Sequence, residues 1–350
     1  MRFLDLFSGA GGASMGIEWA GHEVVGAYDN APKAVETYNE NIEWSQSLEV
    51  DLNTFEDFPE ADAIWSSFPC QIFSRASKAK STFDPEKNGW FATEKAIDIV
   101  EPRVVILENV KGITYHRNNC ASTRSHCPGC FFSNRIMPFL RDRYSCVSHR
   151  IVNAADFGVP QARRRMFVLA SNHPMIWPKP THSLEALMFS QFTTGDYWRE
   201  HGISPTGMSQ KLHKPDNKKR WRTIRDTVYD NKMHNLNNPP DYANEYYLDK
   251  PAPTLMTTEV KGTRGRHMYN QYGNAKPDRV SDYFWLAGWK RRVTLSEALR
   301  LQGFPEGFKL KGTKVQQYRQ IGNAVVPLVA QKVVQAACNI NLWKEKVKWS

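Results

Sequence analysis

Strand-like and helix-like segments alternate along the first half of the chain, and this alternation constrains the fold more than any other feature. Short apolar runs predict strands, and longer amphipathic runs predict helices. Strands that alternate with helices form a mostly parallel sheet covered on both faces, so we predict an α/β fold with a doubly wound sheet. We expect strands at Arg2 to Leu6, Glu23 to Ala27, Leu48 to Leu52, Ala61 to Ser66, Val104 to Leu107, Arg150 to Ala154 and Arg165 to Ala170, and helices at Met15 to Ala20, Pro32 to Asn41 and Phe91 to Val100.

The pattern changes near Trp177, where the chain becomes rich in proline, asparagine and aromatic residues and loses a clear period. Regular helical patterns return at Thr294 to Leu301 and at Leu328 to Ile340. We therefore predict a larger domain at 1–177, a second, smaller and loop-rich domain at 178–290, and a return to the larger domain at 291–350.

The composition indicates a globular protein that does not enter a membrane. Hydrophobic residues make up 41% of the 350 residues, which supports a packed core. No apolar run is long enough to cross a bilayer, and the first residues do not resemble an export signal. Six cysteines in a chain of this length do not indicate a disulfide framework, so we expect a reducing, cytoplasmic location.

The charge is strongly basic, with a formal net charge of +10. A basic balance suggests a polyanionic partner, of which nucleic acid is the commonest, although a solvated basic surface is the alternative. Basic residues gather between Lys211 and Arg225, where Asp216 is the only acid and Trp221 lies within the run. Such a cluster can neutralise phosphates, so the distribution favours nucleic acid.

A glycine-containing segment, Asp5 to Gly12, joins the first expected strand to the first helix. Glycines there let the backbone approach a ligand at the carboxyl ends of the strands, although a plain tight turn is the alternative. The segment departs from the dinucleotide pattern, because the position three after Gly11 is Ser14. Asp29 and Asp51 end the next two strands, where acids can meet a ribose and an adenine amino group or act as helix caps.

Three further segments carry reactive side chains near expected strands. Phe68-Pro69-Cys70-Gln71 follows a strand, and a cysteine there can act as a nucleophile, although cysteine is more often a small buried residue. Glu108 ends an apolar strand, where a carboxylate can serve as a proton donor or be an ordinary strand-end acid. Gln161, Arg163 and Arg165 alternate, so they would share one face of a strand, where arginine suits a phosphate or a base carbonyl.

Taken together, these segments resemble the DNA (cytosine-5)-methyltransferase family of bacteria, archaea and phages. They stand in the family's order and cover both ends of the chain, and only about 178–250 is unmatched, where the family varies. The matching segments are Asp5 to Gly12, Phe68 to Ser74, Glu108 to Val110, Gln161 to Arg165, Arg292 to Phe308 and Gly322 to Pro327. The resemblance implies a Rossmann-like methyltransferase domain, with the smaller domain recognising the DNA target.

The resemblance also implies a reaction: transfer of a methyl group from S-adenosylmethionine to carbon 5 of cytosine in double-stranded DNA. Cys70 would add as a thiolate to carbon 6 of the ring and so activate carbon 5. Glu108 would contact ring nitrogen 3 and the exocyclic amine, and Arg165 would bind the base carbonyl with help from Arg163. The cytosine must leave the duplex stack to be reached, which implies base flipping.

Binding residues are implied in the same way. Cofactor contacts would come from Phe7, Gly9, Gly11, Asp29, Asp51, Leu52, Pro69, Asn323 and Val325. DNA contacts would come from Gln71, Ser74, Lys218, Lys219, Arg220, Arg222 and Thr254, with the lysines meeting phosphates rather than bases. Base-flipping enzymes of this kind often act alone, so we expect a monomer. Membership of a restriction-modification system would also be typical of the family.

Two alternatives keep the resemblance but change the function. The family's RNA-directed branch, which methylates transfer RNA, carries a Cys-Phe-Thr tripeptide in its small domain, and this chain has none. Non-catalytic DNA-binding relatives typically lose the cysteine or the glutamate, whereas Cys70 and Glu108 are both present. A dinucleotide-dependent oxidoreductase is disfavoured by the broken glycine pattern.

The chain departs from the family in a cysteine-rich insert at 115–133. His116, Cys120, Cys127 and Cys130 have a spacing that suits a structural zinc site with tetrahedral N and S ligands. His126 is a rival to His116 as the nitrogen ligand, and a flexible polar loop with incidental thiols is the alternative. We treat the insert as a candidate zinc site beside the DNA.

Overall fold

The computed structural model describes residues 1–69, 88–116, 127–205, 208, 211–213, 215, 217–228, 249–255 and 294–338. The chain divides into two compact units. The first unit comprises Met1–Val152, Arg164–Pro178 and Phe308–Ser350, and the second comprises Asn153–Arg163 and Lys179–Gly307. The domain limits expected from the composition and pattern of the sequence stay a prediction.

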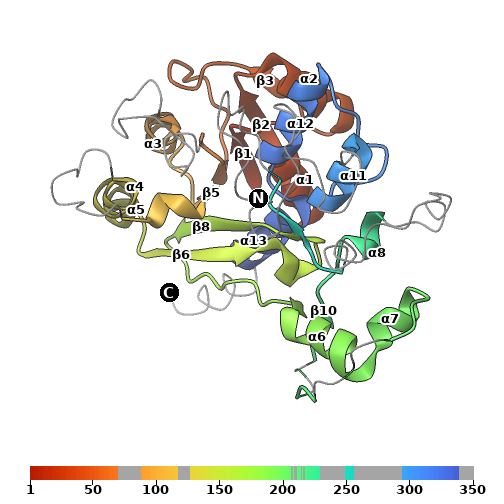
Figure 1. Cartoon of the computed structure of the whole chain (residues 1–350). Coiled ribbons are helices and arrows are strands. Elements are labelled where there is room, and N and C mark those ends of the chain that lie inside the picture. Colours follow the sequence, from red (N-terminus) through yellow and green to blue (C-terminus); the bar gives the residue numbers. More distant parts are fainter. Residues whose placement is uncertain are drawn as a thin grey trace. The chain divides into compact units, whose positions relative to one another are not determined.

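A seven-stranded sheet forms the centre of the first unit, with the strand order β3-β2-β1-β4-β5-β8-β6 (Figure 1). Its strands are β1 (Arg2–Leu6), β2 (Glu23–Asp29), β3 (Ser47–Glu49), β4 (Ala63–Ser66), β5 (Val104–Val110), β6 (Cys146–Asn153) and β8 (Arg164–Ser171). The pairs β1–β2, β1–β4, β2–β3 and β4–β5 are parallel, whereas β5 and β8 are antiparallel. The predicted mostly parallel sheet is confirmed.

Helices cover both faces of this sheet because its strands are apolar on both sides. Leu6, Ile64 and Leu107 share one buried cluster with Trp90 of α3 (Gly89–Val100) and Leu140 of α5 (Met137–Arg143). On the other face, Ser14 of α1 (Gly12–Trp19) donates a hydrogen bond to Asp5 of β1. The sheet is therefore doubly wound, as the alternation of elements predicts.

The last described helix, α13 (Pro327–Ala337), packs against the first, α1. Gly16 permits this contact, because a Cβ atom there would lie 2.6 Å from the Pro327 carbonyl oxygen and 2.7 Å from the Gln331 nitrogen. In Figure 1, α13 and α12 (Lys314–Asn323) appear in blue next to the red N-terminal elements. The two ends of the described chain thus complete one unit.

A further helix, α2 (Pro32–Asn41), lies between β2 and β3 in the chain.

A helical run that the sequence pattern does not predict follows β5. The 3-10 helix η1 (Lys111–Thr114) leaves the strand, and α4 (Pro128–Phe131), the π-helical turn η3 (Phe132–Ile136) and α5 then form one continuous run. Phe131, Ile136 and Leu140 of this run are buried in the same cluster as β5. The predicted insert at 115–133 is therefore partly an ordered helix that belongs to the core of the first unit.

The second unit consists of short elements held largely by polar contacts. Its described elements are η4 (Ala154–Phe157), β7 (Gln161–Ala162), β9 (His182–Ser183), α6 (Leu184–Phe189), η5 (Ser190–Thr194), α7 (Asp196–Glu200), β10 (Lys219–Arg220), α8 (Arg225–Val228), β11 (Ala252–Pro253) and α11 (Leu295–Gln302). At its centre, Asp249 accepts hydrogen bonds from Tyr197 at 2.7 Å and from Arg225 at 2.6 Å. The ion pair of Arg225 and Asp249 is buried, since each side chain is only 5% exposed.

None of the helices within the described ranges is both long enough and apolar enough to cross a membrane.

Candidate active site

The loop between β1 and α1 has the geometry of a ligand cradle. Phe7, Gly9 and Gly11 all have positive φ angles, of 60°, 55° and 89°. A side chain at Gly11 would collide with Ile42 and Tyr38, whereas a Cβ at Gly9 would have no atom within 4 Å. Open space therefore lies beside the backbone at Gly9, and strain of this kind at Phe7 is typical of functional loops.

Asp29 at the end of β2 fixes this loop. Its carboxylate accepts hydrogen bonds from the Gly9 N–H at 2.9 Å and from the Ala31 N–H at 2.8 Å. Burial raises the pKa of Asp29, and these backbone hydrogen bonds oppose the rise. Each carboxylate oxygen has a second lone pair, so the group can accept further hydrogen bonds from a bound hydroxyl.

Asp51 follows β3 and closes a turn. Its Oδ1 accepts from the Asn53 N–H at 2.9 Å, and the carboxylate is exposed, while Leu52 beside it is buried. Asp51 therefore offers a polar contact to a ligand, and Leu52 offers an apolar one. Asn323 and Val325 lie at the end of α12 and just before α13; Asn323 is exposed and Val325 is buried.

The glycine loop meets the segment that precedes the predicted nucleophile. A Cβ at Gly89 would lie 2.6 Å from Cδ of Pro69 and 2.9 Å from Cζ of Phe7, so these three residues are packed together. Cys70, Gln71 and Ser74 lie outside the described residues. Pro69 is exposed and Phe68 is buried, so the chain emerges from the core directly before Cys70.

Asn109 fixes the same segment from β5. Its side-chain Nδ2 donates a hydrogen bond to the Phe68 carbonyl oxygen at 2.9 Å, and Asn109 is only 1% exposed. The end of β5 thus holds the backbone two residues before Cys70. The sequence motif Glu108-Asn109-Val110 indicates a role for its glutamate but not for its asparagine; a polar side chain inside an apolar strand is the signal that could have revealed it.

Glu108 and Arg165 form an ion pair across β5 and β8. The Arg165 Nε lies 3.1 Å from Glu108 Oε1, and both side chains are mostly buried. Because Arg165 is paired in register with Val110, Glu108 is its diagonal neighbour on the same face of the two strands. The structure therefore brings together two of the predicted catalytic residues.

Gln161 and Arg163 are placed differently from the expectation of one continuous strand. The chain turns at Arg163, whose N–H donates to the Gln161 carbonyl oxygen at 2.9 Å, so β7 and β8 are separate strands. Arg163 is buried and donates to the Leu255 carbonyl oxygen at 3.3 Å. The Thr254 hydroxyl donates to the Ala162 carbonyl oxygen at 3.2 Å, so these residues support the second unit from within.

The predicted DNA-contact cluster contains two kinds of basic residue. Lys218, Lys219 and Arg222 are exposed. Arg220, in contrast, is half-buried, and its guanidinium pairs with Asp226 at 2.8 Å and with Glu200 at 2.7 Å. The exposed residues are available to a polyanion, whereas Arg220 is held by two carboxylates of its own unit.

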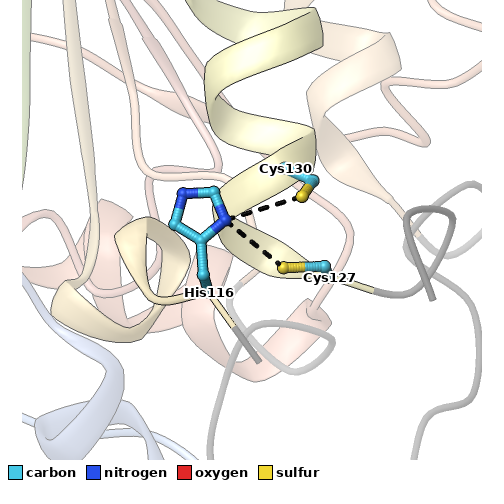
Figure 2. Close-up of side chains that lie close together, drawn as sticks. All are labelled: His116, Cys127 and Cys130. Atoms are coloured by element: carbon cyan, nitrogen blue, oxygen red, sulfur yellow. Dashed lines mark hydrogen bonds between the residues drawn. The ribbon is translucent and has the colours of Figure 1, made fainter. Parts of the chain in front are cut away.

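Three of the four predicted metal ligands lie together. His116, Cys127 and Cys130 converge in the first unit, as Figure 2 shows, while Cys120 and His126, the rival of His116, lie outside the described residues.

Comparison with solved structures shows which known proteins share this fold. The S. pombe Dnmt2 methyltransferase matches with a TM-score of 0.56 at 18% identity, covering 100% of both chains. The methyltransferase EhMeth of Entamoeba histolytica matches with a TM-score of 0.58 at 16% identity, covering 97% of this chain and 98% of that one. The fold is therefore shared with these two methyltransferases.

Sequence comparison then gives the family. The Type II methyltransferase M.AplI of Arthrospira platensis is 29% identical over 344 residues, covering 95% of this chain and 84% of that protein. M1.HphI of Haemophilus parahaemolyticus is 28% identical over 364 residues, covering 97% and 87%. A model of the C-5 cytosine-specific DNA methylase family matches residues 1–339. The chain belongs to this family and is a DNA (cytosine-5) methyltransferase, which confirms the resemblance seen in its motifs.

Proposed function

We propose that the protein transfers a methyl group from S-adenosylmethionine to carbon 5 of cytosine in double-stranded DNA through a covalent adduct with Cys70. The observation that carries this proposal is the arrangement at the end of β5. There Glu108 pairs with Arg165, and the adjacent Asn109 holds the backbone two residues before Cys70. A nucleophile, an acid and a cation would thus converge on one strand end.

Cys70 supplies the nucleophile, because carbon 5 of cytosine is a poor nucleophile by itself. The thiolate lone pair forms a bond to carbon 6, and the electrons of the ring double bond move to carbon 5. Carbon 5 then takes the methyl group; the bond between that methyl carbon and the sulfonium sulfur would break, and the donor would leave as a neutral thioether. A base removes the proton from carbon 5, the double bond re-forms, and the bond between carbon 6 and sulfur breaks to release the thiolate.

Glu108 and Arg165 stabilise the charge that this addition moves into the ring. Glu108 contacts ring nitrogen 3 and the exocyclic amine, while Arg165 donates to the base carbonyl. An arginine has five N–H groups, of which Glu108 and the Arg164 carbonyl engage two. Arg163 supports Arg165 through the backbone between β7 and β8.

The residues of the glycine loop fit the methyl donor, which supplies an electrophilic methyl group when bound. The open space at Gly9 admits a ligand against the backbone, and Asp29 beside it can accept hydrogen bonds from ribose hydroxyls. Asp51 and Leu52 would hold the adenine. Phe7, Gly11 and Pro69 would line the same space, and Asn323 and Val325 would contact the methionine end.

The second unit would hold and read the DNA. Lys218, Lys219 and Arg222 are exposed and would meet phosphates, and Thr254 would be a further DNA contact. Gln71 and Ser74 would fill the gap left by the flipped cytosine. Because the relatives M.AplI and M1.HphI are named Type II methyltransferases, we propose that the protein modifies a specific site in a restriction-modification system. We further propose that it acts as a monomer, as base-flipping enzymes of this kind often do.

A covalent trap tests this mechanism. Bisulfite sequencing of DNA methylated by the protein first identifies the target cytosine. In duplex DNA that carries 5-fluorocytosine at this target, carbon 5 bears fluorine in place of hydrogen, so no proton can be removed from it after methyl transfer. We expect a stable protein–DNA adduct that requires S-adenosylmethionine, with Cys70 as the linked residue by mass spectrometry. Cys70→Ala should form no adduct while still binding DNA, whereas Cys146→Ala, which changes a thiol on β6, should behave as the wild type. An active Cys70→Ala variant would refute the assignment.

A further inference from the structure

Three side chains of types that can bind a metal converge near the carboxyl end of β5, apart from the catalytic and cofactor-binding residues described above. His116 follows η1, Cys127 directly precedes α4, and Cys130 lies within α4. The His116 Nδ1 lies 3.5 Å from the Cys130 Sγ and 3.8 Å from the Cys127 Sγ, and all three atoms lie within 4.8 Å of one another. Figure 2 shows both sulfur atoms directed at the same ring nitrogen.

Hydrogen bonding within this group does not account for its geometry. A neutral imidazole nitrogen has either one lone pair or one proton, so Nδ1 can form only one well-directed hydrogen bond. Two thiols at similar distances from one Nδ1 therefore compete for a single position. A cation bound by all three atoms removes this competition, because each atom then directs its own lone pair at the metal.

The distances agree with a tetrahedral zinc site. Zinc binds sulfur at about 2.3 Å and histidine nitrogen at about 2.0–2.1 Å, so tetrahedral angles place ligand sulfur and nitrogen atoms about 3.6 Å apart. The two measured separations, 3.5 and 3.8 Å, lie on either side of this value. Sulfur and imidazole ligands favour zinc over magnesium or calcium, which prefer oxygen.

The backbone around the group is built for close approach. Gly129 donates its N–H to the Tyr115 carbonyl oxygen at 3.1 Å, which ties the start of α4 to the residue before His116. A Cβ at Gly129 would lie 2.9 Å from the backbone nitrogen of His116, so a larger residue would push the two segments apart. Cys127 and Cys130 are both buried. Glycine between the two cysteines therefore allows His116 to reach them.

We propose that His116 Nδ1, Cys127 Sγ and Cys130 Sγ bind a structural Zn²⁺ ion. Binding converts both thiols to thiolates and releases their protons to solvent. The ion ties the segment that leaves β5 to the helical run α4–η3–α5, whose Phe131 and Leu140 pack in the core beside that strand. It would thereby hold the exit of the strand that carries Glu108. Cys120 was predicted from its spacing as the fourth ligand and lies outside the described residues.

Metal analysis of the full chain tests this proposal. The protein is purified under reducing conditions without chelators or a histidine tag, and its zinc, iron and copper contents are measured by mass spectrometry. We expect about one zinc per chain, falling below about a fifth of that in Cys127→Ser, Cys130→Ser and His116→Ala. Cys146→Ser is the matched control, because Cys146 is a thiol of the same unit outside the group, and it should keep its zinc.

Two further measurements on the wild type cover the case in which the variants do not fold. Cobalt(II) reconstitution should give the intense near-ultraviolet band of thiolate-to-cobalt charge transfer. Iodoacetamide should label Cys127 and Cys130 only after a chelator is added. A chain that contains no zinc and takes up none, one that holds iron instead, or variants that keep their zinc would overturn the proposal. These readouts do not depend on methyl transfer, so failure of the reaction proposed above would leave them unchanged.

Discussion

At the scale of single residues, the most unusual group is Asp5, which is completely buried beneath the glycine loop. Its Oδ2 accepts a hydrogen bond from Ser14 at 2.6 Å, and Ser14 in turn accepts one from Tyr38 at 2.9 Å. Among the described atoms, Oδ1 has no hydrogen-bond partner. Burial raises the pKa of Asp5 to about 7; the Ser14 hydrogen bond opposes this rise and the nearby Asp29 carboxylate adds to it.

This pKa predicts how stability changes with pH. In the unfolded chain Asp5 loses its proton near its ordinary pKa of 3.8, whereas in the folded chain it keeps it up to about pH 7. Between these values folding takes up a proton, so the contribution of Asp5 is full below the lower value, falls as the pH rises, and is lost above the upper one. We expect Asp5→Asn, which cannot ionise, to flatten the decline of the urea midpoint between about pH 4 and pH 7.

The exposed Asp57→Asn is the control for the Asp5 measurement and should keep the wild-type pH dependence. If Asp5→Asn and the wild type declined in parallel, the carboxyl would be ionised in the folded protein and the account of its burial would be wrong.

Asn109 gives a second prediction at this scale. Asn109→Ala removes the side-chain donor to the Phe68 carbonyl, and the loss of one hydrogen bond costs about 0.5–1.5 kcal/mol. If this loss displaces Cys70 from its reactive position, the rate falls by roughly 2- to 10-fold. We expect kcat and the rate of 5-fluorocytosine adduct formation to fall together, with little change in the KM for DNA.

Asn172→Ala is the matched control for Asn109. The Asn172 side chain also binds the backbone, accepting a hydrogen bond from the Ser145 N–H at 2.9 Å, but it follows the end of β8 that pairs with the start of β5. Its loss should leave kcat unchanged. Equal effects of the two substitutions would mean that Asn109 acts only through general stability.

At the scale of secondary-structure elements, the sequence predicts the central strands of the sheet better than the strand β3 at its edge. Buried apolar runs identify β1, β4 and β5 because strands enclosed on both faces are apolar throughout. The run expected at Leu48 to Leu52 yields a shorter β3, because Asp51 closes a turn with the Asn53 N–H. Side-chain turns of this kind compete with the sheet and leave no trace in hydrophobic periodicity.

The helical run α4–η3–α5 was missed for a different reason. Pro138 lies inside α5, and proline within a helical pattern normally argues for an end or a break. Here the wider π-helical turn η3 directly precedes α5 and accommodates the change in hydrogen bonding. In the candidate site, the residue types of Glu108 and Arg165 were predictable, but their pairing depends on the antiparallel register of β5 and β8, which no local pattern encodes.

The contact between α1 and α13 predicts how a substitution at Gly16 changes the stability of the first unit. Gly16→Ala should destabilise the first unit by about 1–3 kcal/mol, because the added methyl group overpacks the helix contact. Two of the three nearest atoms are backbone atoms, the Pro327 oxygen and the Gln331 nitrogen, so Ala330→Gly should not rescue the variant. Urea denaturation followed by circular dichroism measures both effects. A double variant as stable as the wild type would place the clash in the Ala330 side chain alone.

At the scale of the whole molecule, the net charge of +10 and the exposed basic residues of the second unit favour a polyanionic substrate. The structure separates these charges by role, since Lys219 and Arg222 face solvent whereas Arg220 pairs with Asp226 and Glu200. Composition alone could not make this distinction, because all three residues belong to one basic run. The assignment depends on which carboxylates the fold brings to each cation.

That separation predicts different effects for neighbouring substitutions, one on DNA binding and the other on thermal stability. The double variant Lys219→Gln, Arg222→Gln should weaken DNA binding and reduce the slope of log affinity against log salt by about 0.9 for each phosphate that the protein no longer neutralises. Its thermal midpoint should stay close to that of the wild type. Arg220→Gln should instead lower the thermal midpoint, because it removes the arginine that pairs with the mostly buried Asp226 and leaves only His201 beside that carboxylate among the described ion pairs.

Binding titrations at several salt concentrations, together with thermal denaturation, measure both predictions. If the double variant kept the wild-type salt slope, Lys219 and Arg222 would lie outside the DNA interface.

The pairing of α1 with α13 also sets an order of events during synthesis. Gln331 of α13 donates a hydrogen bond to the Trp19 carbonyl oxygen across 312 residues of sequence. At a translation rate of roughly 5 to 20 residues per second, the apolar side of α1 emerges from the ribosome roughly 15 to 60 seconds before the helix that covers it. The surface of α1 that α13 covers therefore stays exposed on the nascent chain until α13 has been translated.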